Sequence, residues 1–163
     1  MANKEFEKLI NDIDHNKKFS LLKRELHHGI TRYDHSMRVA RWTYKICNLF
    51  KMKNKDITTR AALLHDFYIN EDLNKVSSVK ALNVHPSKAL ENSKKFFEIN
   101  SIQEDIIVNH MFPCTKKLPK TKEGLLVSGV DKAVSTYEML RFKASLYAGI
   151  YLLFLFELIR IPK

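Results

Sequence analysis

Apolar residues recur along most of the chain at spacings of three and four, which is the spacing of one face of an α-helix. No segment shows the strict alternation of apolar and polar residues that marks a half-buried strand. The pattern therefore predicts an all-α fold. The expected helices cover residues 1–11, 19–28, 33–50, 56–66, 86–97, 101–110, 122–142 and 144–159.

Two of these helix starts carry a local signal. Pro86 suits the first turn of a helix, because its missing N–H would have no partner there. The polar, weakly patterned stretch 68–84 before it is therefore expected to be an irregular loop. Ser101 is followed three residues later by Glu104, which is the spacing of a capping box.

The final apolar run, Ala144 to Ile159, has two interpretations. It falls short of the roughly 20 residues of a membrane-spanning helix, and Glu157 interrupts its end. A closing helix packed on the core is the first interpretation. Contact with a membrane or with a partner is the second, because basic residues flank the run. These are Arg141, Lys143, Arg160 and Lys163.

The length of 163 residues fits a single domain with a real core. The chain holds only 4 Gly and 4 Pro, which favours long helices with short connections. We expect residues 1–28 to form N-terminal helices that pack on the core, residues 29–142 to form the core itself, and residues 143–163 to form an apolar C-terminal helix.

The charge balance favours anionic partners. Lys and Arg number 28 against 18 Asp and Glu, which gives a net charge of +10. Nucleotides, phosphorylated metabolites, nucleic acid and acidic lipid would all be attracted, and a solvated basic surface explains the same numbers. Nucleic acid is not an expected partner, since the helix with Arg32, Arg38 and Arg41 carries no motif that reads it.

Cysteine usage and the first residues predict a location. Cys47 and Cys114 stand far apart and in no C-x-x-C frame, which is typical of free thiols in a reducing compartment. The charged first residues contain no apolar segment of a secretory signal. We therefore expect a cytoplasmic protein, peripheral to the membrane if residues 144–159 contact it.

The strongest candidates for chemistry are histidines and aspartates at expected helix ends or in apolar surroundings. In AALLHDFYIN, His65 and Asp66 follow an apolar run that has no need of them, and Asp131 lies within VSGVDKAV. Taken singly, each has a plain structural explanation, such as a hydrogen-bonded core histidine. The full set is His35, His65, Asp66, His85, His110 and Asp131.

Taken together, these six side chains predict a metal centre. A buried imidazole or carboxylate is costly unless it is paired or coordinated. Four imidazoles and two carboxylates would satisfy two divalent cations such as iron, manganese or zinc. A carboxylate that bridges both ions explains why Asp66 directly follows His65. Two such ions sharing a hydroxide can hydrolyse a phosphate ester, which agrees with the basic charge.

Five stretches carry these residues in the order H…HD…H…H…D: YDHSMRVA, AALLHDFYIN, NVHPSKAL, IIVNHMFP and VSGVDKAV. In this order they resemble the HD-domain metal-dependent phosphohydrolase superfamily, and the resemblance covers residues 33–140. The HP and NH motifs are similar to those of the subgroup that binds two metals, and the whole resembles small bacterial HD phosphohydrolases. The resemblance implies an HD-domain helical bundle, in agreement with the apolar pattern.

The resemblance also implies two metal sites that share Asp66 as a bridge. The other implied ligands are His35, His65 and Asp131 for the first site, and His85 and His110 for the second.

The chain departs from the family just after the HD pair. Many relatives read HDIGK, whose lysine contacts the substrate phosphate, and here Tyr68 and Ile69 replace the glycine and the lysine. Arg38, one turn after the first histidine, could clamp a phosphate instead, and Lys88 is placed like a substitute lysine. A surface arginine and a solvated lysine are the plain alternatives. The candidate catalytic residues are His65, Asp66, Arg38 and Lys88.

The expected function is hydrolysis of a phosphate ester or anhydride in a nucleotide or another small phosphorylated compound, by a metal-bound hydroxide. The alternative is a non-catalytic HD module that senses a nucleotide or binds a partner, associated with the membrane through its C-terminal helix. The complete ligand set favours the enzyme. No GYP triplet accompanies the pattern, which argues against cyclic-dinucleotide cleavage of that type.

Overall fold

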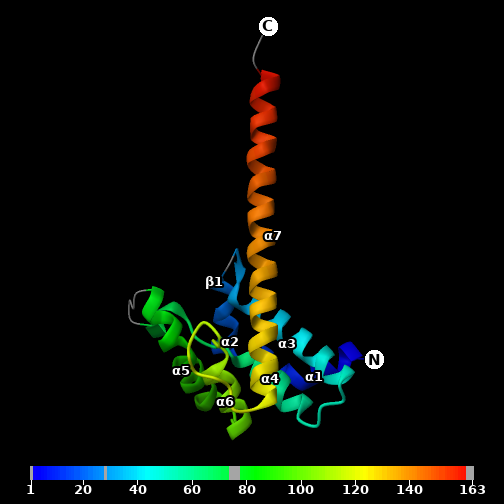
Figure 1. Cartoon of the computed structure of the whole chain (residues 1–163), viewed down its shortest axis with the longest axis vertical. Helices are drawn as coiled ribbons and strands as arrows, with labels where there is room; N and C mark the ends of the chain where they lie inside the picture. Colours follow the sequence, from blue (N-terminus) through cyan, green and yellow to red (C-terminus); the bar gives the residue numbers. More distant parts are fainter. Residues whose placement is uncertain (1, 28, 74–77, 161–163) are drawn as a thin grey trace.

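The computed structural model describes residues 2–27, 29–73 and 78–160, and within them the all-α prediction is confirmed (Figure 1). A two-stranded antiparallel sheet of two residues a strand is the only addition to the helices in the described part. The elements are α1 (Ala2–Asp14), α2 (Lys17–Ser20), η1 (Leu21–Arg24), β1 (Leu26–His27), β2 (Ile30–Thr31), α3 (Arg32–Leu49), α4 (Lys55–Leu64), η2 (Asn70–Leu73), α5 (Ser78–Phe96), α6 (Ser101–Asn109) and α7 (Lys122–Arg160).

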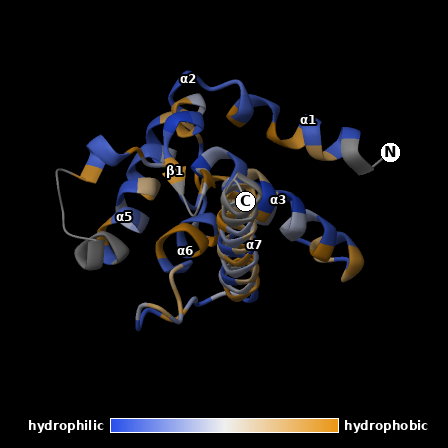
Figure 2. Cartoon of the chain, turned by 90° about the horizontal axis from the view of Figure 1, so that it is seen from above, coloured by the Kyte–Doolittle hydropathy of each residue, from blue (hydrophilic) through white to orange (hydrophobic). Residues whose placement is uncertain are grey.

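The body of the molecule is a helical bundle that includes the N-terminal part of α7 (Figure 1). Helix α3 packs against α4 and α7, while α6 packs against α4, α5 and α7. Seen down α7, α3 and α6 flank that helix (Figure 2). Helix α1 adds Phe6, Ile10 and Ile13 to the same apolar core as the buried run Ala61–Leu64. These contacts bring α3, α4, α6 and α7 together in the body of the molecule.

The predicted helix over residues 19–28 is wrong in its second half. Asn16 caps the short α2 by accepting hydrogen bonds from the N–H groups of Lys18 and Phe19, and the chain then passes through η1 into β1. The turn between the strands places Gly29 at φ 83°, a left-handed conformation that suits glycine. The ring of Phe142 lies so close that a Cβ at this position would be 2.2 Å from it.

The predicted loop over residues 68–84 and the position of Pro86 need correction. Helix α5 begins at Ser78, so Pro86 lies inside the helix rather than in its first turn. A proline there costs a backbone hydrogen bond. Burial of the neighbouring His85 and Ala89 in the bundle outweighs that local cost.

The predicted capping box is displaced by one residue. Asn100, not Ser101, caps α6: its side chain accepts a hydrogen bond from the N–H of Gln103, and the Gln103 side chain accepts one from the N–H of Asn100. Asn is as good an N-cap as Ser, and Gln completes the reciprocal pair as Glu would.

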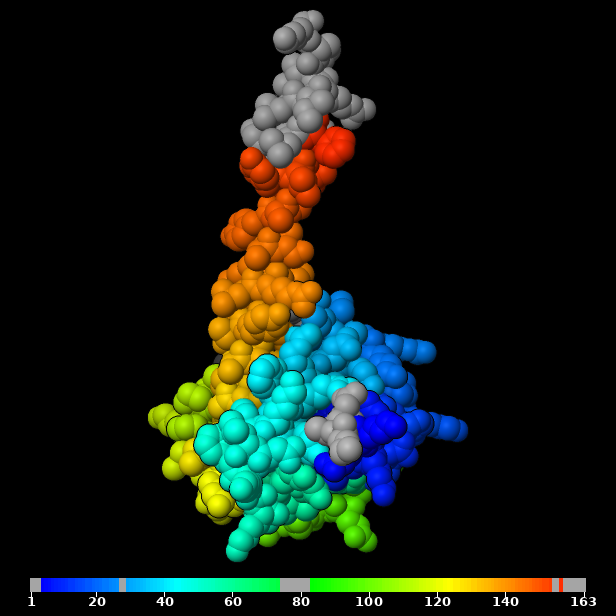
Figure 3. Space-filling view, turned by 90° about the vertical axis from the view of Figure 1, so that its right-hand side faces the viewer, coloured from blue at the N-terminus to red at the C-terminus, as the bar shows by residue number. Residues whose placement is uncertain are grey.

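The two predicted helices at the end of the chain are one helix, α7, of 39 residues. No proline separates residues 142 and 144, so nothing in the sequence breaks the helix there. The prediction that this end packs on the core is wrong for the described residues: α7 leaves the body and projects from it (Figure 3). Its exposed large apolar side chains beyond the body include Leu146, Tyr147, Ile150, Tyr151, Leu152, Leu153 and Phe156.

Among the residues that the structure describes, no helix combines the length and the apolar character needed to cross a membrane.

Candidate metal centre

The structure brings all six predicted ligands together inside the bundle. They come from five elements: His35 from α3, His65 and Asp66 from the end of α4, His85 from α5, His110 from the end of α6, and Asp131 from α7. All six are buried, with exposed fractions between 0% and 6%. Such a concentration of imidazoles and carboxylates away from water requires strong partners.

Three of these side chains form one group around the Asp131 carboxylate. Nε2 of His35 lies 3.0 Å from Oδ1 of Asp131, and Nε2 of His65 lies 3.6 Å from the same oxygen. One ligand atom of each of the three residues lies within 4.8 Å of the others. This spacing fits three ligands of a single cation.

A second group surrounds the Asp66 carboxylate. Oδ1 of Asp66 lies 3.4 Å from Nε2 of His85 and 3.5 Å from Nε2 of His110, while Oδ2 lies 3.8 Å from Nε2 of His65. The two Nε2 atoms of His85 and His110 are 3.1 Å apart. Asp66 therefore lies between the histidine pair of the second group and the shared His65, which is where a bridging carboxylate is needed.

Helix ends explain how two of the histidines are oriented. Nδ1 of His65 donates to the carbonyl oxygen of Ala62, and Nδ1 of His110 donates to that of Ile107, each at 2.7 Å. Both carbonyls belong to the last turn of a helix, where carbonyl groups lack an intrahelical partner. These bonds place the proton on Nδ1 and leave Nε2 free to act as a ligand.

The donor set fits a divalent cation. Nε2 of His65 is buried and has no hydrogen-bond partner within the described residues. Burial and the neighbouring His65 lower the pKa of His110 to about 3, so its imidazole is neutral, which is the form that binds a metal. Burial raises the pKa of Asp131, but the hydrogen bond with His35 and the nearby charge of Lys132 outweigh burial and lower the pKa well below its ordinary value, so this carboxylate is ionised.

The pKa shift of His35 differs in direction from that of His110. Burial lowers its pKa, but hydrogen bonds with Asp131 and Glu138 outweigh burial and raise the pKa to about 9. In the protein without a metal, the ring is thus a cation that ion-pairs with two carboxylates. Binding of a divalent cation at this position requires the ring to lose that proton.

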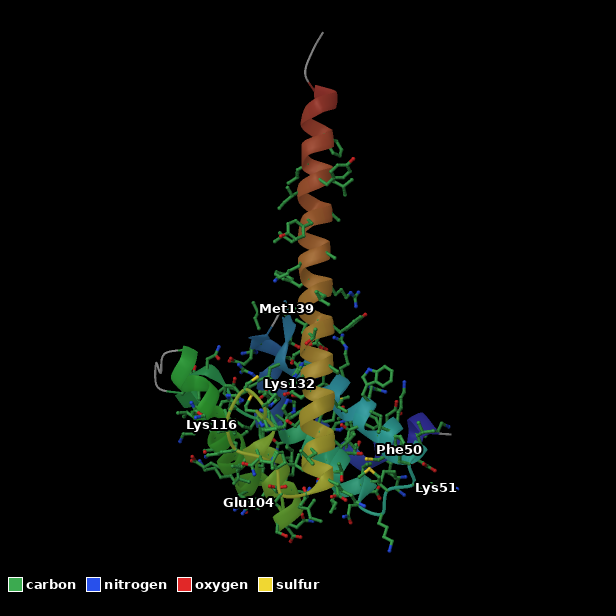
Figure 4. The ribbon with its side chains drawn as sticks, viewed as in Figure 1. Phe50, Lys51, Glu104, Lys116, Lys132 and Met139 are labelled. Carbon is green, nitrogen blue, oxygen red and sulfur yellow. The ribbon has the colours of Figure 1, made fainter. Side chains whose placement is uncertain are left out.

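Two residues of this centre were missed from the sequence. Glu138 is buried, and its Oε2 accepts a hydrogen bond from Nδ1 of His35 at 2.8 Å. It stands seven residues after Asp131, so both lie on one face of α7, and this periodicity is the signal that could have found it. Lys132 lies where α7 passes through the body (Figure 4), with Nζ 2.6 Å from Oδ2 of Asp131 and 3.2 Å from the carbonyl oxygen of His110.

Arg38 and Lys88, which the sequence predicts to bind phosphate, both form ion pairs with glutamates instead of facing the six clustered side chains. Nη1 of Arg38 donates to Oε1 of Glu138, so the guanidinium lies on the Nδ1 side of His35, behind the ligand. Nζ of Lys88 lies 2.8 Å from Oε2 of Glu91 in an exposed ion pair. A contact of either residue with a substrate stays a prediction, and these positions do not support it.

The segment after the HD pair is packed rather than open. Tyr68 and Ile69 are both buried, and the Tyr68 ring lies 5.1 Å from that of His85. The guanidinium of Arg32 stacks on Tyr68 at 3.9 Å and donates to its carbonyl oxygen at 3.0 Å. The positions that many relatives fill with glycine and lysine therefore serve packing in this chain.

One of the comparisons with known proteins identifies a family. No curated protein and no solved structure matches the chain. The family model for the HD domain matches residues 32–134, which include all six clustered side chains and more than half of the chain. We conclude that the chain belongs to the HD-domain family of metal-dependent phosphohydrolases.

Proposed function

We propose that this protein hydrolyses a phosphate ester or anhydride in a nucleotide or another small phosphorylated compound, with two divalent cations at the clustered side chains. The observation that carries this proposal is the position of the Asp66 carboxylate, with oxygens 3.4 Å and 3.5 Å from His85 and His110 on one side and 3.8 Å from His65 on the other. Carboxylates that join two ligand groups in this way suit a pair of cations.

Each residue of the centre has a defined task in this proposal. His35, His65 and Asp131 hold one cation, His85 and His110 hold the other, and Asp66 serves both. Bound divalent cations make water a stronger nucleophile and offset the negative charge of a phosphoryl group. The backbone carbonyls behind His65 and His110 fix which ring nitrogen faces the cations.

Lys132 supports an anionic substrate at this centre. Its ammonium group is partly exposed and sits beside Asp131, at the edge of the ligand cluster. A fixed cation there would attract and orient a phosphate group. The net charge of +10 acts in the same direction at longer range.

The test is turnover of a panel of phosphate compounds with added Mn²⁺. The panel contains phosphomonoesters, cyclic nucleotides and dinucleoside polyphosphates. We expect one class to be hydrolysed, with loss of activity in His65→Ala and Asp66→Asn. His15→Ala is the matched control, since His15 is exposed and bonds only within α1 and its end. No turnover of any class by metal-loaded protein, or full activity in Asp66→Asn, would refute the proposal.

A second candidate function is that of an HD module without turnover that binds a nucleotide or a partner at a membrane. The apolar side chains of α7 beyond the body favour it, because at 100° per residue they cover all sides of the helix, which a single partner helix would not bury. Arg141 and Lys143 are exposed at its base, where anionic headgroups would lie. Co-sedimentation of the full chain with phosphatidylglycerol vesicles tests this, and protein that stays in the supernatant would contradict it.

A further inference from the structure

Glu138 is a buried carboxylate with two defined partners. Its side chain is fully buried, in α7, two turns beyond Asp131. A carboxylate in such a place is unfavourable unless its oxygens are paired. Here each oxygen has a donor: Oε2 accepts from Nδ1 of His35 at 2.8 Å, and Oε1 accepts from Nη1 of Arg38.

His35 needs a partner from outside its own helix. His65 and His110 each use a carbonyl from the last turn of a helix, where carbonyls are free. His35 lies in the first turn of α3, which begins at Arg32, and carbonyls there accept the hydrogen bonds of the helix itself. The carboxylate of Glu138, from α7, is the acceptor for Nδ1 of His35 instead.

The hydrogen bond decides which ring nitrogen of His35 faces the centre. With Nδ1–H directed at Glu138, Nε2 points to Asp131, whose Oδ1 lies 3.0 Å away. Partners of this kind fix the plane and the tautomer of a ligand histidine and make it a stronger ligand.

Arg38 holds the carboxylate in position. Its guanidinium is half-buried, bonded to Glu138 on one side and bordering an apolar groove of about 600 Å³ on the other, with Trp42 and Tyr137 among the lining residues. It balances the charge of a carboxylate that has no contact with water. This accounts for an arginine one turn after the ligand histidine that does not face the ligand cluster.

We propose that Glu138 is a positioning residue for the metal ligand His35, and that Arg38 fixes Glu138 for this task. The proposal rests on the proposed function in one respect, namely that a cation binds at His35, His65 and Asp131. It adds that the affinity of this one site depends on a residue that does not touch the cation.

The test is the affinity of the full chain for Mn²⁺ at each of its two sites, measured by competition with a chelator. Glu138→Gln is the informative variant, because an amide of the same shape cannot accept from both His35 and Arg38 at once. We expect affinity at the site of His35 to fall about 10–100-fold, with affinity at the site of His85 and His110 unchanged. Arg38→Gln should weaken the same site by a smaller factor.

Glu123→Gln is the matched control. Glu123 is also a buried glutamate of α7, but it accepts its hydrogen bond from Asn54, at 3.0 Å, and not from a ligand. This variant should keep both affinities. General damage to the fold by Glu138→Gln would weaken both sites together, so an equal loss at both would overturn the positioning role.

A spectroscopic measurement gives a second result that does not depend on turnover. Long-range ¹H–¹⁵N spectra of the Zn²⁺-loaded protein report which imidazole nitrogen carries the proton. We expect the signals of His35 to change in Glu138→Gln while those of His110 stay. Wild-type affinity and an unchanged His35 signal in Glu138→Gln would overturn the inference and leave the proposed function standing, whereas wild-type protein that binds no metal would remove both.

Discussion

Asp105 is expected to stabilise the fold around the centre by connecting α6 to the residues just before α7. This buried aspartate of α6 accepts hydrogen bonds from the N–H of Lys120 at 3.0 Å, and from the N–H and Oγ1 of Thr121 at 2.9 Å and 2.7 Å. Asn109 donates a further one at 2.8 Å. The carboxylate thus ties the start of α7 to α6, and with it the relative positions of His110 and Asp131.

Replacing Asp105 with Asn removes the charge and leaves one oxygen instead of two. The new amide N–H₂ would face backbone N–H donors, so at least two of the present hydrogen bonds are lost. Hydrogen bonds to a charged group contribute about 1.5–3 kcal/mol each, so the loss of two costs about 3–6 kcal/mol at neutral pH. For a domain of this size, the midpoint of thermal unfolding should fall by roughly 6–24 °C.

The loss of stability in Asp105→Asn should become smaller as the pH falls. Burial raises the pKa of Asp105, but the hydrogen bonds from Lys120, Thr121 and Asn109 outweigh it and lower the pKa below its ordinary value of 3.8. A lowered folded-state pKa contributes stability that is present above the unfolded value and is lost as the pH falls through the folded value. The difference between wild type and Asp105→Asn should therefore be full at pH 7 and shrink below about pH 4.

Urea unfolding with a chelator present, at pH 7 and again near pH 3, measures both effects without a contribution from bound metal. Glu104→Gln is the control: the neighbouring glutamate forms only an exposed ion pair with Lys94, which contributes at most about 1 kcal/mol. A change below about 1 kcal/mol in Asp105→Asn at pH 7, or a change of equal size at both pH values, would refute the reasoning.

Three further outcomes are expected. Asp66→Asn should lower the bound metal by at least one ion per chain, because this one carboxylate serves both ligand groups. Metal analysis after dialysis measures the content, and a wild-type content in the variant would contradict this. With the metal chelated, the protein should lose stability as the pH rises from 7 to 10, because the pKa of His35 is raised to about 9 in the folded protein. The stability that the protonated ring contributes is complete below about pH 6.5 and is lost as the pH passes 9. Urea titrations should show this fall in stability with pH in wild type and less of it in His35→Gln. Arg32→Leu should cost about 3 kcal/mol, because it breaks a buried charged hydrogen-bond network around Tyr68; a loss under about 1 kcal/mol by thermal unfolding would argue against that role.

The six clustered side chains could be named from the sequence because their order along the chain, H…HD…H…H…D, resembles a known family, and because three of them also stand in apolar surroundings. His65 and Asp66 follow an apolar run that ends a helix, and Asp131 stands among apolar residues of another. A polar group in apolar surroundings can be recognised without knowing which other residues surround it. The structure brings these residues together as the sequence predicted.

Glu138 was missed because the sequence gives only a weak signal for it, namely that it shares a helix face with Asp131. Its partner His35 is 103 residues away in the chain, so the sequence alone does not show that the glutamate is buried and paired. The same limit explains Arg38, which the sequence assigned to a phosphate and the structure pairs with Glu138.

The prediction that the end of α7 packs on the core was wrong for a different reason. An apolar run predicts that a surface will be covered, but it does not say that the covering surface belongs to the same chain. The described residues of this chain offer none beyond the body, and the helix continues unbroken into that space.

In the proposed function, six side chains from five elements hold two cations, one on each side of Asp66. Anomalous diffraction from crystals grown with Mn²⁺ tests it most directly. We expect two peaks about 3.5–4 Å apart on either side of the Asp66 carboxylate, one among His35, His65 and Asp131 and the other beside His85 and His110. No peak among these side chains, or peaks that leave Asp66 without a contact, would contradict it.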